Sequence, residues 1–382
     1  MPLIYIVAGE ASGDVLGARL MAALRAQRPG AEFAGIGGAR MAEQGFMSLF
    51  PLADLAVMGI IEVLPRVRLL RRRLAETMAD IAARKPDIVV TIDSPGFTHR
   101  VLAATAKLGI PRVHYVAPQV WAWREGRVRH FPGLWDRLLC LLPFEPGFFA
   151  RHGLAGRFVG HPVLESGSGG GDGVGFRLRH GIGQDVQILV LMPGSRGGEV
   201  TRLLPVYAAT LALLSARFPG LVPVVPVAPG VADAVIRATA GWPVRPLVVT
   251  SLAEKHDAYA AADAALTKSG TSTLELALAG VPMAVTYRVN PLTAALAKRL
   301  VKVKFAALVN LLAGRAVVPE LIQELCTPER LAATVGTLLD GSGAAAAQRA
   351  AFGPILAGLA APVGRPSEAA AAAVLELLPP AA

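Results

Sequence analysis

The sequence predicts an α/β fold of two Rossmann-like, doubly wound domains that face a cleft, followed by Ala- and Leu-rich C-terminal helices. Three observations support this fold. Short apolar runs typical of buried strands alternate with helical patterns in both halves of the chain. A Gly/Ser-rich segment separates the halves, and glycine-bearing loops follow several of the strands. A cleft between two such sheets is where ligands usually bind.

The expected strands set the domain boundaries. In the first half they cover residues 3–8, 32–36, 87–93, 112–116 and 137–142, and a helix is expected over 14–27. In the second half they cover residues 188–192, 221–227, 247–249, 264–267 and 283–287. We therefore expect domains at 1–165 and 176–345, a flexible linker or surface loop at 166–175, and C-terminal helices at 346–382 that pack back on the first domain.

Composition limits the class of protein. The 382 residues are 53% hydrophobic and 17% charged, which suits a globular chain with large cores. No uncharged apolar stretch is long enough for a membrane span, and the first ten residues lack the basic start of a signal peptide, so a cytoplasmic protein is expected. Cys140 and Cys326 are expected to be reduced thiols, and the seven scattered histidines predict no metal site. The net charge of +10 indicates an anionic partner: nucleic acid, a membrane surface or an anionic substrate.

The stretch P-G-S-R-G-G-E, which begins at Pro193, directly follows a predicted strand and precedes a helical pattern. Amide groups at a helix N-terminus attract anions, and the Arg196 guanidinium adds a charged donor. Gly194, Ser195 and Arg196 therefore form a candidate diphosphate site. Ordinary loop geometry explains this stretch equally well when it is taken alone.

A second loop of this kind is K-S-G-T-S-T-L-E, which begins at Lys268. Its hydroxyls and amides suit phosphate, and Glu275, one helical turn further on, is within reach of ribose hydroxyls. The candidate residues are Ser269, Gly270, Thr271, Ser272 and Glu275. A Ser/Thr cap in front of an ordinary helix is the simpler interpretation of the loop by itself.

The first half also carries glycine loops after strands. In G-E-A-S-G-D, from Gly9, we expect Ser12 to cap a helix that begins at Asp14 while the loop amides face the cleft. A further loop, F-A-G-I-G-G, begins at Phe33. The first loop lacks the G-x-G-x-x-G spacing, which argues against a nicotinamide or flavin dinucleotide.

Asp93 ends the predicted strand D-I-V-V-T-I-D and would lie at the carboxyl edge of the sheet. An Asp at that place can act as a general base, and it can equally cap the Ser-Pro turn that follows. Trp121 and Trp123 lie in a loop after a neighbouring strand, where they could stack on a sugar or line an acyl pocket, although such pairs often belong to the core.

A basic amphipathic helix is expected around residues 64–81. Its apolar positions are Leu64, Val67, Leu70, Leu74, Met78 and Ile81, and its arginines are Arg66, Arg68, Arg71, Arg72 and Arg73. Five arginines within eight positions favour contact with an anionic bilayer, with the apolar side in lipid or in an acyl pocket. The alternative is an ordinary surface helix that packs its apolar stripe on the sheet.

Nine ordered motifs resemble the lipid-A-disaccharide synthase family. They are G-E-A-S-G-D at Gly9, V-M-G-I-I-E-V-L at Val57, I-D-S-P-G-F at Ile92, H-Y-V-A-P-Q-V-W-A-W-R at His114, L-P-F-E at Leu142, F-V-G-H-P at Phe158, P-G-S-R-G-G-E at Pro193, S-G-T-S-T-L-E at Ser269, and A-K-R-L-V-K at Ala297 with N-L-L-A-G-R at Asn310.

The resemblance implies an inverting glycosyltransferase of the GT-B type. It would transfer 2,3-diacylglucosamine from UDP-2,3-diacylglucosamine to the primary hydroxyl of 2,3-diacylglucosamine 1-phosphate and release UDP, at the inner face of the inner membrane and with no metal or redox cofactor. The family's loop usually reads Asp-x-Pro-Asp-Phe. Gly96 replaces its second Asp here, which leaves Asp93 as the sole carboxylate expected there.

The resemblance also suggests roles for single residues. Asp93 matches the family's proposed base, and the loops at Gly194 and Ser269 match the donor site. Ser12 and Asp14 match a loop of the first domain that faces the cleft, and Asn310 and Arg315 match phosphate or sugar contacts in the second domain. Ser12 and Asn310 are therefore expected beside Asp93 as catalytic residues, and Asp14 and Arg315 as contacts to the acceptor or an acyl chain.

Other classes stay open. A different GT-B-type UDP-sugar enzyme, such as a peptidoglycan glycosyltransferase or a sugar-nucleotide epimerase, would share the donor loops. A nucleic-acid-binding protein is suggested by charge alone, and no module of that kind is visible, so no nucleic-acid partner is expected. A homo-oligomer remains open.

Overall fold

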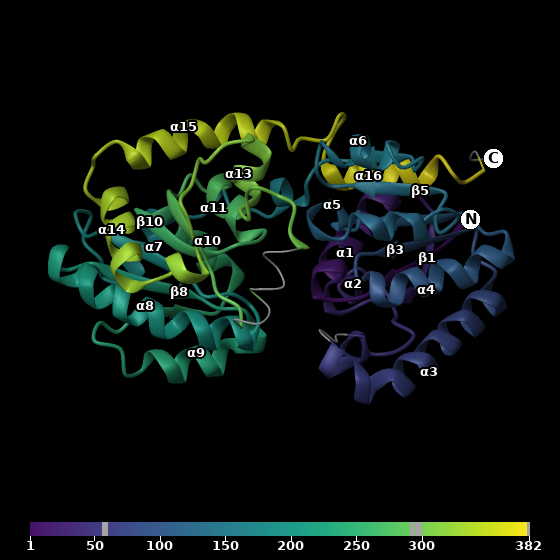
Figure 1. The fold of residues 1–382 in the computed structure, drawn as a ribbon. Coiled ribbons are helices and arrows are strands. Elements are labelled where there is room, and N and C mark those ends of the chain that lie inside the picture. The colour runs from purple at the N-terminus through teal and green to yellow at the C-terminus, as the bar shows by residue number, and fades with distance from the viewer. Residues whose placement is uncertain (56–59, 291–293, 295–299, 380–382) are drawn as a thin grey trace. The chain divides into compact units, whose positions relative to one another are not determined.

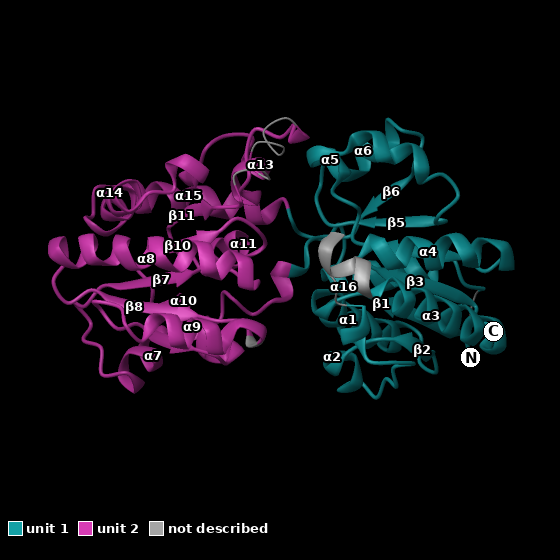
Figure 2. Cartoon of the chain, turned by 60° about the horizontal axis from the view of Figure 1, so that its bottom comes forward, with its two compact units in different colours: residues 1–162, 359–382 teal, residues 163–358 magenta. Residues whose placement is uncertain are grey.

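A computed structural model describes residues 1–55, 60–290, 294 and 300–379. It divides into two compact units (Figures 1 and 2): unit 1 is Met1–Pro162 with Leu359–Ala382, and unit 2 is Val163–Gly358. The motif at Val57 and the motif at Ala297 lie partly outside the described residues. None of the helices within the described ranges is both long and apolar enough to cross a membrane.

Unit 1 is built on a parallel sheet with the order β2-β1-β3-β4-β5-β6. Its strands are β1 (Leu3–Ala8), β2 (Glu32–Ile36), β3 (Ile88–Ile92), β4 (Arg112–Tyr115), β5 (Arg137–Cys140) and β6 (Gly156–Phe158). Its helices are α1 (Ala11–Gln27), α2 (Ala39–Ala42), α3 (Ile60–Arg84), α4 (Pro95–Thr105), α5 (Val120–Trp123), α6 (Glu145–Ala150) and α16 (Pro366–Leu375). The strand order reverses between β1 and β3, which is the switch point where ligands of such sheets bind.

Residues of β1 are buried on both faces of the sheet, as the apolar runs predict for a parallel sheet covered by helices. Ile4 and Ile6 pack on the side of α1 and α16, whereas Tyr5 and Val7 pack on the side of α3 and α4. The chain therefore builds two cores around one sheet, which fixes the loops at its carboxyl edge.

Unit 2 repeats the architecture with the order β12-β11-β10-β7-β8-β9. Its strands are β7 (Ile188–Met192), β8 (Val222–Pro226), β9 (Leu247–Val249), β10 (Ala264–Lys268), β11 (Met283–Tyr287) and β12 (Glu320–Ile322). Its helices are α7 (Gly173–Arg179), α8 (Gly197–Arg217), α9 (Ala232–Thr239), α10 (Leu252–Ala261), α11 (Ser272–Leu278), α13 (Leu308–Ala313), α14 (Pro328–Leu339) and α15 (Ala344–Ala357). The order reverses between β7 and β10, so this switch point receives the loops at Gly194 and Ser269.

The Gly/Ser-rich segment, expected as a flexible linker or surface loop, packs closely on α10. Ser168 is fully buried, and its hydroxyl lies 3.5 Å from Nε2 of His256 on α10. A Cβ at Gly171 would collide with the His256 carbonyl, and one at Gly173 would collide with the backbone of Ala260. The glycines therefore allow close packing of this segment on α10.

The chain after residue 345 is divided between the units, whereas the expected boundary assigned all of it to one set of helices. Helix α15 packs on α11, α13 and α14 in unit 2. Helix α16 packs on α1 in unit 1, where Ala370, Ala371 and Val374 are fully buried. The crossing back to unit 1 lies at Gly358–Leu359.

Candidate functional site

The switch point of unit 1 brings two loops together. Strands β1 and β3 are paired with Ala8 opposite Ile92, so the loops that follow them leave the same edge side by side. A Cβ at Gly9 would collide with the side chain of Ser94, so only glycine allows this approach. Glu10 and Asp93 therefore lie on adjacent loops.

Asp93 has a constrained backbone. It and Ser94 both have left-handed conformations, with φ of +52° and +48°, which are unfavourable for residues other than glycine. The Asp93 amide donates to the Tyr115 carbonyl at 2.9 Å, and Thr98 Oγ1 donates to the Asp93 carbonyl at 2.7 Å. These bonds from β4 and α4 hold the strained turn and fix where the carboxylate points.

Asp93 Oδ1 also accepts a hydrogen bond from the Ser94 amide at 2.7 Å. The capping contact that the Ser-Pro turn suggests is therefore present, and it occupies only one of the two oxygens of this half-buried side chain. Stabilising the turn does not exclude a role for the carboxylate as a base.

The pKa of Asp93 is raised to about 6, chiefly by burial and next by the charge of Glu10, whose carboxyl group is also hydrogen-bonded to it. The Ser94 amide opposes this shift. Ser12 Oγ donates to Glu10 Oε1 at 2.8 Å and orients that side chain. Asp93 is the sole carboxylate of its own loop, as expected, and Glu10 supplies a second one from the neighbouring loop.

Ser12 does not cap a helix at Asp14. Helix α1 begins at Ala11 and its N-cap is Glu10, without a capping hydrogen bond from that side chain. The Ser12 hydroxyl instead bonds to Glu10, so it lies beside the carboxyl pair rather than acting as a cap.

Asp14 is assigned a structural role by its contacts. Its carboxylate is 4% exposed and accepts hydrogen bonds from the amides of Gly38 at 2.7 Å, Arg40 at 2.9 Å and Met41 at 3.1 Å. It therefore caps the start of α2 and ties the G-I-G-G loop to α1. This corrects the expectation that Asp14 contacts the acceptor or an acyl chain.

The two tryptophans differ in their surroundings. Trp121 Nε1 donates to Oε1 of the buried Glu145 at 3.1 Å, and its ring meets that of Phe144 edge to face. Trp123 is 41% exposed, with the Arg124 guanidinium 4.0 Å from its ring centroid. Trp121 thus packs within unit 1, and Trp123 is the one whose ring is accessible to a ligand.

The switch point of unit 2 carries the P-G-S-R-G-G-E loop. Helix α8 begins at Gly197, and Arg196 is its extended N-cap. Gly194 has φ of +113°, and a Cβ there would collide with Glu199, so glycine is required. Ser195 and Arg196 are exposed, as are the glycines of the first turn. Their amides and the guanidinium are accessible to an anion at the positive end of a 21-residue helix.

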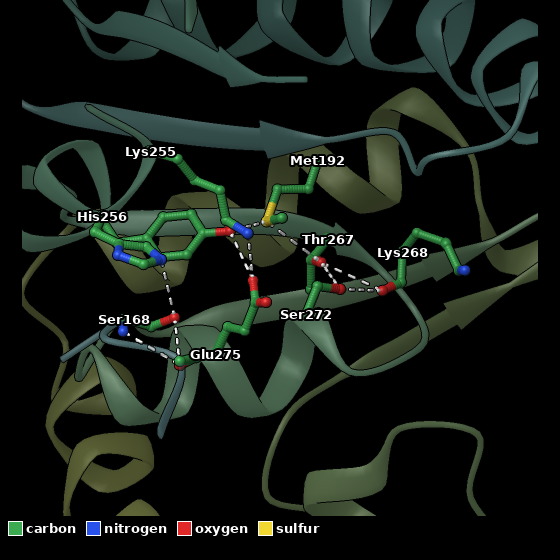
Figure 3. Close-up of polar contacts among 10 residues, drawn as sticks. Ser168, Met192, Lys255, His256, Thr267, Lys268, Ser272 and Glu275 are labelled. Atoms are coloured by element: carbon green, nitrogen blue, oxygen red, sulfur yellow. Dashed lines mark hydrogen bonds and ion pairs between the residues drawn. The ribbon is translucent and has the colours of Figure 1, made fainter. Parts of the chain in front are cut away.

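The second loop of this switch point follows β10, which pairs with β7 so that Thr267 lies opposite Met192. Ser272 Oγ lies 2.9 Å from Thr267 Oγ1 and donates to the Lys268 carbonyl at 3.1 Å (Figure 3). Ser269 Oγ donates to the Ala306 carbonyl at 2.7 Å. Both serines therefore shape the loop.

Two further residues of this loop, Gly270 and Thr271, are well placed for a ligand. Thr271 is exposed and is the N-cap of α11, with no capping bond from its own side chain. Gly270 has φ of +149°, a conformation that other residues rarely adopt. The loop thus presents its backbone at Gly270 and the hydroxyl of Thr271.

Glu275 is held firmly one turn into α11. Its Oε2 lies 2.8 Å from Lys255 Nζ and accepts a hydrogen bond from the Tyr259 hydroxyl at 3.3 Å (Figure 3). The side chain is 21% exposed. Two contacts from α10 thus orient a carboxylate that solvent can still reach.

Asn310 is not a catalytic residue in this structure. It is fully buried, and its side chain makes four hydrogen bonds: Nδ2 donates to the Val318 carbonyl and to Glu320 Oε1, both at 2.8 Å, and Oδ1 accepts from the amides of Val317 at 2.7 Å and Val318 at 2.9 Å. An Asn side chain with every donor and acceptor satisfied has nothing left for a substrate. Asn310 therefore connects α13 to the segment before β12.

Arg315 is exposed beside a shallow pocket between α13 and α15, with a volume of about 360 Å³. The remaining lining is apolar: Ala313, Ala347, Ala350, Ala351, Pro354 and Ile355. This chemistry is compatible with the phosphate, sugar or acyl contact expected of Arg315.

The basic helix α3 uses its two faces differently. Leu70, Leu74 and Met78 pack against the core of unit 1 and Ile81 is fully buried in it, so the ordinary packing alternative holds for this part of the helix. The side chain of Leu64 lies outside the described residues.

The five arginines of α3 fall into two groups. Arg66, Arg68 and Arg71 are exposed and form no ion pair with any residue in the described ranges. Arg72 lies 3.5 Å from Glu76. Arg73 pairs with Asp54 at 2.5 Å and Glu76 at 2.6 Å, and is only 18% exposed. The expected membrane contact of Arg73 is thus wrong, because this side chain holds the fold of unit 1.

The chain is similar to known proteins over nearly its whole length. The family model described as lipid-A-disaccharide synthetase matches residues 4–362. The lipid-A-disaccharide synthase of Gluconobacter oxydans is 60% identical over 98% of this chain and 91% of the relative. That of Granulibacter bethesdensis is 59% identical over 99% of each chain.

Solved structures resemble it in fold. The UDP-GlcNAc 2-epimerase of Neisseria meningitidis, bound to UDP-GlcNAc, has a TM-score of 0.64 at 11% identity over 98% of this chain and 99% of the other. Spinosyn rhamnosyltransferase SpnG, complexed with thymidine diphosphate, has a TM-score of 0.64 at 14% identity over 98% and 100%. The two Rossmann-like sheets are therefore those of a GT-B-type fold.

Proposed function

Because the chain belongs to the lipid-A-disaccharide synthase family, whose reaction is a glycosyl transfer, we propose that its donor is UDP-2,3-diacylglucosamine and its acceptor 2,3-diacylglucosamine 1-phosphate. The products are the β-1,6-linked disaccharide 1-phosphate and UDP. One observation carries the proposal: the family's motif residues lie at the switch point of each sheet, Asp93 in unit 1 and the loops at Gly194 and Ser269 in unit 2.

In the proposed mechanism Asp93 removes the proton from the primary hydroxyl of the acceptor. The hydroxyl oxygen attacks the anomeric carbon of the donor sugar as the bond to the diphosphate breaks, which inverts the configuration. Arg196 and the N-terminus of α8 offset the negative charge that develops on the leaving UDP. Glu275, oriented by Lys255 and Tyr259, binds the ribose hydroxyls.

The test is a product assay with both acylated substrates. Formation of a disaccharide 1-phosphate with one equivalent of UDP supports the proposal. The structural neighbours include an epimerase, so UDP-GlcNAc is assayed in parallel. Turnover of that sugar nucleotide without an acceptor, and none of the acylated pair, would assign the chain to the epimerase alternative.

The exposed arginines of α3 support a further part of the proposal, that the protein rests on the anionic inner face of the inner membrane. Each basic residue near such a surface contributes about 1 kcal/mol. Charge reversal of Arg66, Arg68 and Arg71 to Glu is expected to lower sedimentation with anionic vesicles at least about tenfold. The unfolding temperature should not change, because these side chains lie outside the core.

A matched control reverses three exposed arginines of unit 2, Arg237, Arg245 and Arg330, which changes the net charge equally. This control should still bind the vesicles. Equal loss of vesicle binding in both variants would attribute binding to net charge. No loss in the variant of Arg66, Arg68 and Arg71 would show that α3 serves only the fold of unit 1.

The pKa of Asp93 predicts a pH dependence. A carboxyl base works when deprotonated, so kcat/KM should fall about tenfold per pH unit below the pKa of about 6. Glu10→Gln removes a neighbouring negative charge, which lowers the Asp93 pKa and shifts this limb to lower pH, while burial keeps part of the shift. The exposed Glu32→Gln is the control. An acid limb that stays in place in Glu10→Gln would show that Glu10 does not act on the base.

A further inference from the structure

Lys268 is a charged residue at the switch point of unit 2 that directly precedes the S-G-T-S-T-L-E motif and is not among the candidate donor-site residues. It is the last residue of β10, and its Nζ lies 3.1 Å from Oε1 of Glu199 in the first turn of α8. Both side chains are mostly buried, at 18% and 11% exposed. This ion pair connects the two loops of the switch point.

Glu199 holds more than one cation. Arg196 Nη1 lies 3.5 Å from the same Oε1 atom. Its Oε2 is buried, has no hydrogen-bond partner among the described residues, and occupies the space where a Cβ of Gly194 would lie. The Glu199 carboxylate therefore lies against the P-G-S-R loop. Arg196, three residues earlier in the chain, and Lys268, at the end of β10, both contact it.

The ammonium of Lys268 also lies beside the second glycine loop. A Cβ built on Gly270 would be 3.6 Å from Lys268 Nζ. In Figure 3 the Lys268 side chain extends away from the Lys255–Glu275 pair, so the two lysines serve different parts of the site. Lys268 thus places a positive charge between the two loops that would enclose a diphosphate.

The charges at this place favour an anion. Arg196 and Lys268 carry two positive charges against one negative charge on Glu199, and the N-terminus of α8 adds its positive end. A compact ammonium is suited to phosphate as a point charge, whereas the guanidinium supplies directed hydrogen bonds. A structural ion pair would satisfy Glu199 with one cation and leave no net positive charge.

We propose that Lys268 is a second cationic contact to the diphosphate of the donor, and that Glu199 is a positioning residue that holds Lys268 and Arg196 in place in the unliganded site. This inference rests on the proposed function for the identity of the donor. It extends the anion site from the α8 loop to the end of β10.

The experiment compares UDP, UMP and uridine binding by calorimetry in the wild type, Lys268→Met and Lys268→Arg. Loss of one charge-assisted contact should weaken UDP binding about 10- to 100-fold in Lys268→Met, UMP less and uridine not at all. Lys268→Arg keeps the charge and should recover most of the affinity. Arg237→Met, which removes an exposed charge elsewhere in unit 2, should bind UDP as the wild type does.

Glu199→Gln tests the positioning role. It should raise KM for the donor and weaken UDP binding less than Lys268→Met does. In the double variant the two effects should be smaller than their sum, since Glu199 acts through Lys268. Unchanged UDP affinity and turnover in Lys268→Met, with the fold intact by thermal unfolding, would overturn the inference and leave a structural ion pair.

The two proposals can fail separately. If the wild type binds UDP but forms no disaccharide, the proposed function fails while the ligand series still tests Lys268. If the wild type forms the disaccharide and Lys268→Met binds UDP equally well, only the Lys268 inference fails.

Discussion

Replacing Asp93 with Asn is expected to lower turnover about 10²- to 10⁴-fold, the usual contribution of a general base, while UDP affinity stays at the wild-type value. Asn is the substitution of choice because it tolerates the left-handed backbone found at φ of +52° and can still accept from the Ser94 amide. The change therefore removes the proton acceptor and preserves the turn. Initial rates of UDP release and calorimetric UDP binding measure the two effects.

The control is Asp185→Asn, an exposed Asp in unit 2 that should leave turnover unchanged. Glu10→Gln extends the experiment, because Glu10 is the other carboxyl group at this switch point. Normal turnover in Asp93→Asn would exclude Asp93 as the base. A large loss in Glu10→Gln in the same series would transfer that role to Glu10.

The sequence predicted the elements that place the site because parallel strands buried on both faces leave long apolar runs. Of the twelve strands in the described part of the chain, the apolar runs predict ten to within two residues at either end. β6 (Gly156–Phe158) and β12 (Glu320–Ile322) were missed, since three residues with a polar or glycine start carry no such run. The candidate loops could be located because each one directly follows a predicted strand.

Residue roles were harder to predict because they depend on partners far away in sequence. Asn310 and Asp14 lie in segments that match the family, yet their polar atoms are satisfied by segments that only the fold brings near. In the sequence Arg73 looks like the other arginines of α3, and only the folded structure shows its ion pair with Asp54. The role of Glu10 is hard to predict for the same reason. It belongs to a quoted motif, and only the pairing of β1 with β3 makes it a neighbour of Asp93.

Arg196→Ala is expected to lower kcat about 10²- to 10³-fold, the typical effect of removing one preorganised donor that stabilises developing charge, and to weaken UDP binding about tenfold or more. Arg196 is 53% exposed and touches Glu199 only at 3.5 Å, so most of its donors are open to a ligand. As the N-cap of α8 it has extended backbone that Ala can adopt, so the fold should be retained. Steady-state kinetics with the acylated donor, together with UDP calorimetry, measure both losses.

Arg196→Lys separates charge from geometry at this position. Lys keeps the positive charge but lacks the planar fork, so it should restore part of the UDP affinity and less of kcat if the guanidinium acts on the leaving diphosphate. Arg202 lies six residues further along α8, where its guanidinium donates to the Gly198 carbonyl at 2.6 Å. Arg202→Ala therefore serves as a neighbouring control with a smaller expected effect. If Arg196→Ala retained wild-type donor affinity and turnover, the diphosphate would have to be assigned to another part of unit 2. The P-G-S-R-G-G-E stretch would then be an ordinary loop that binds no anion.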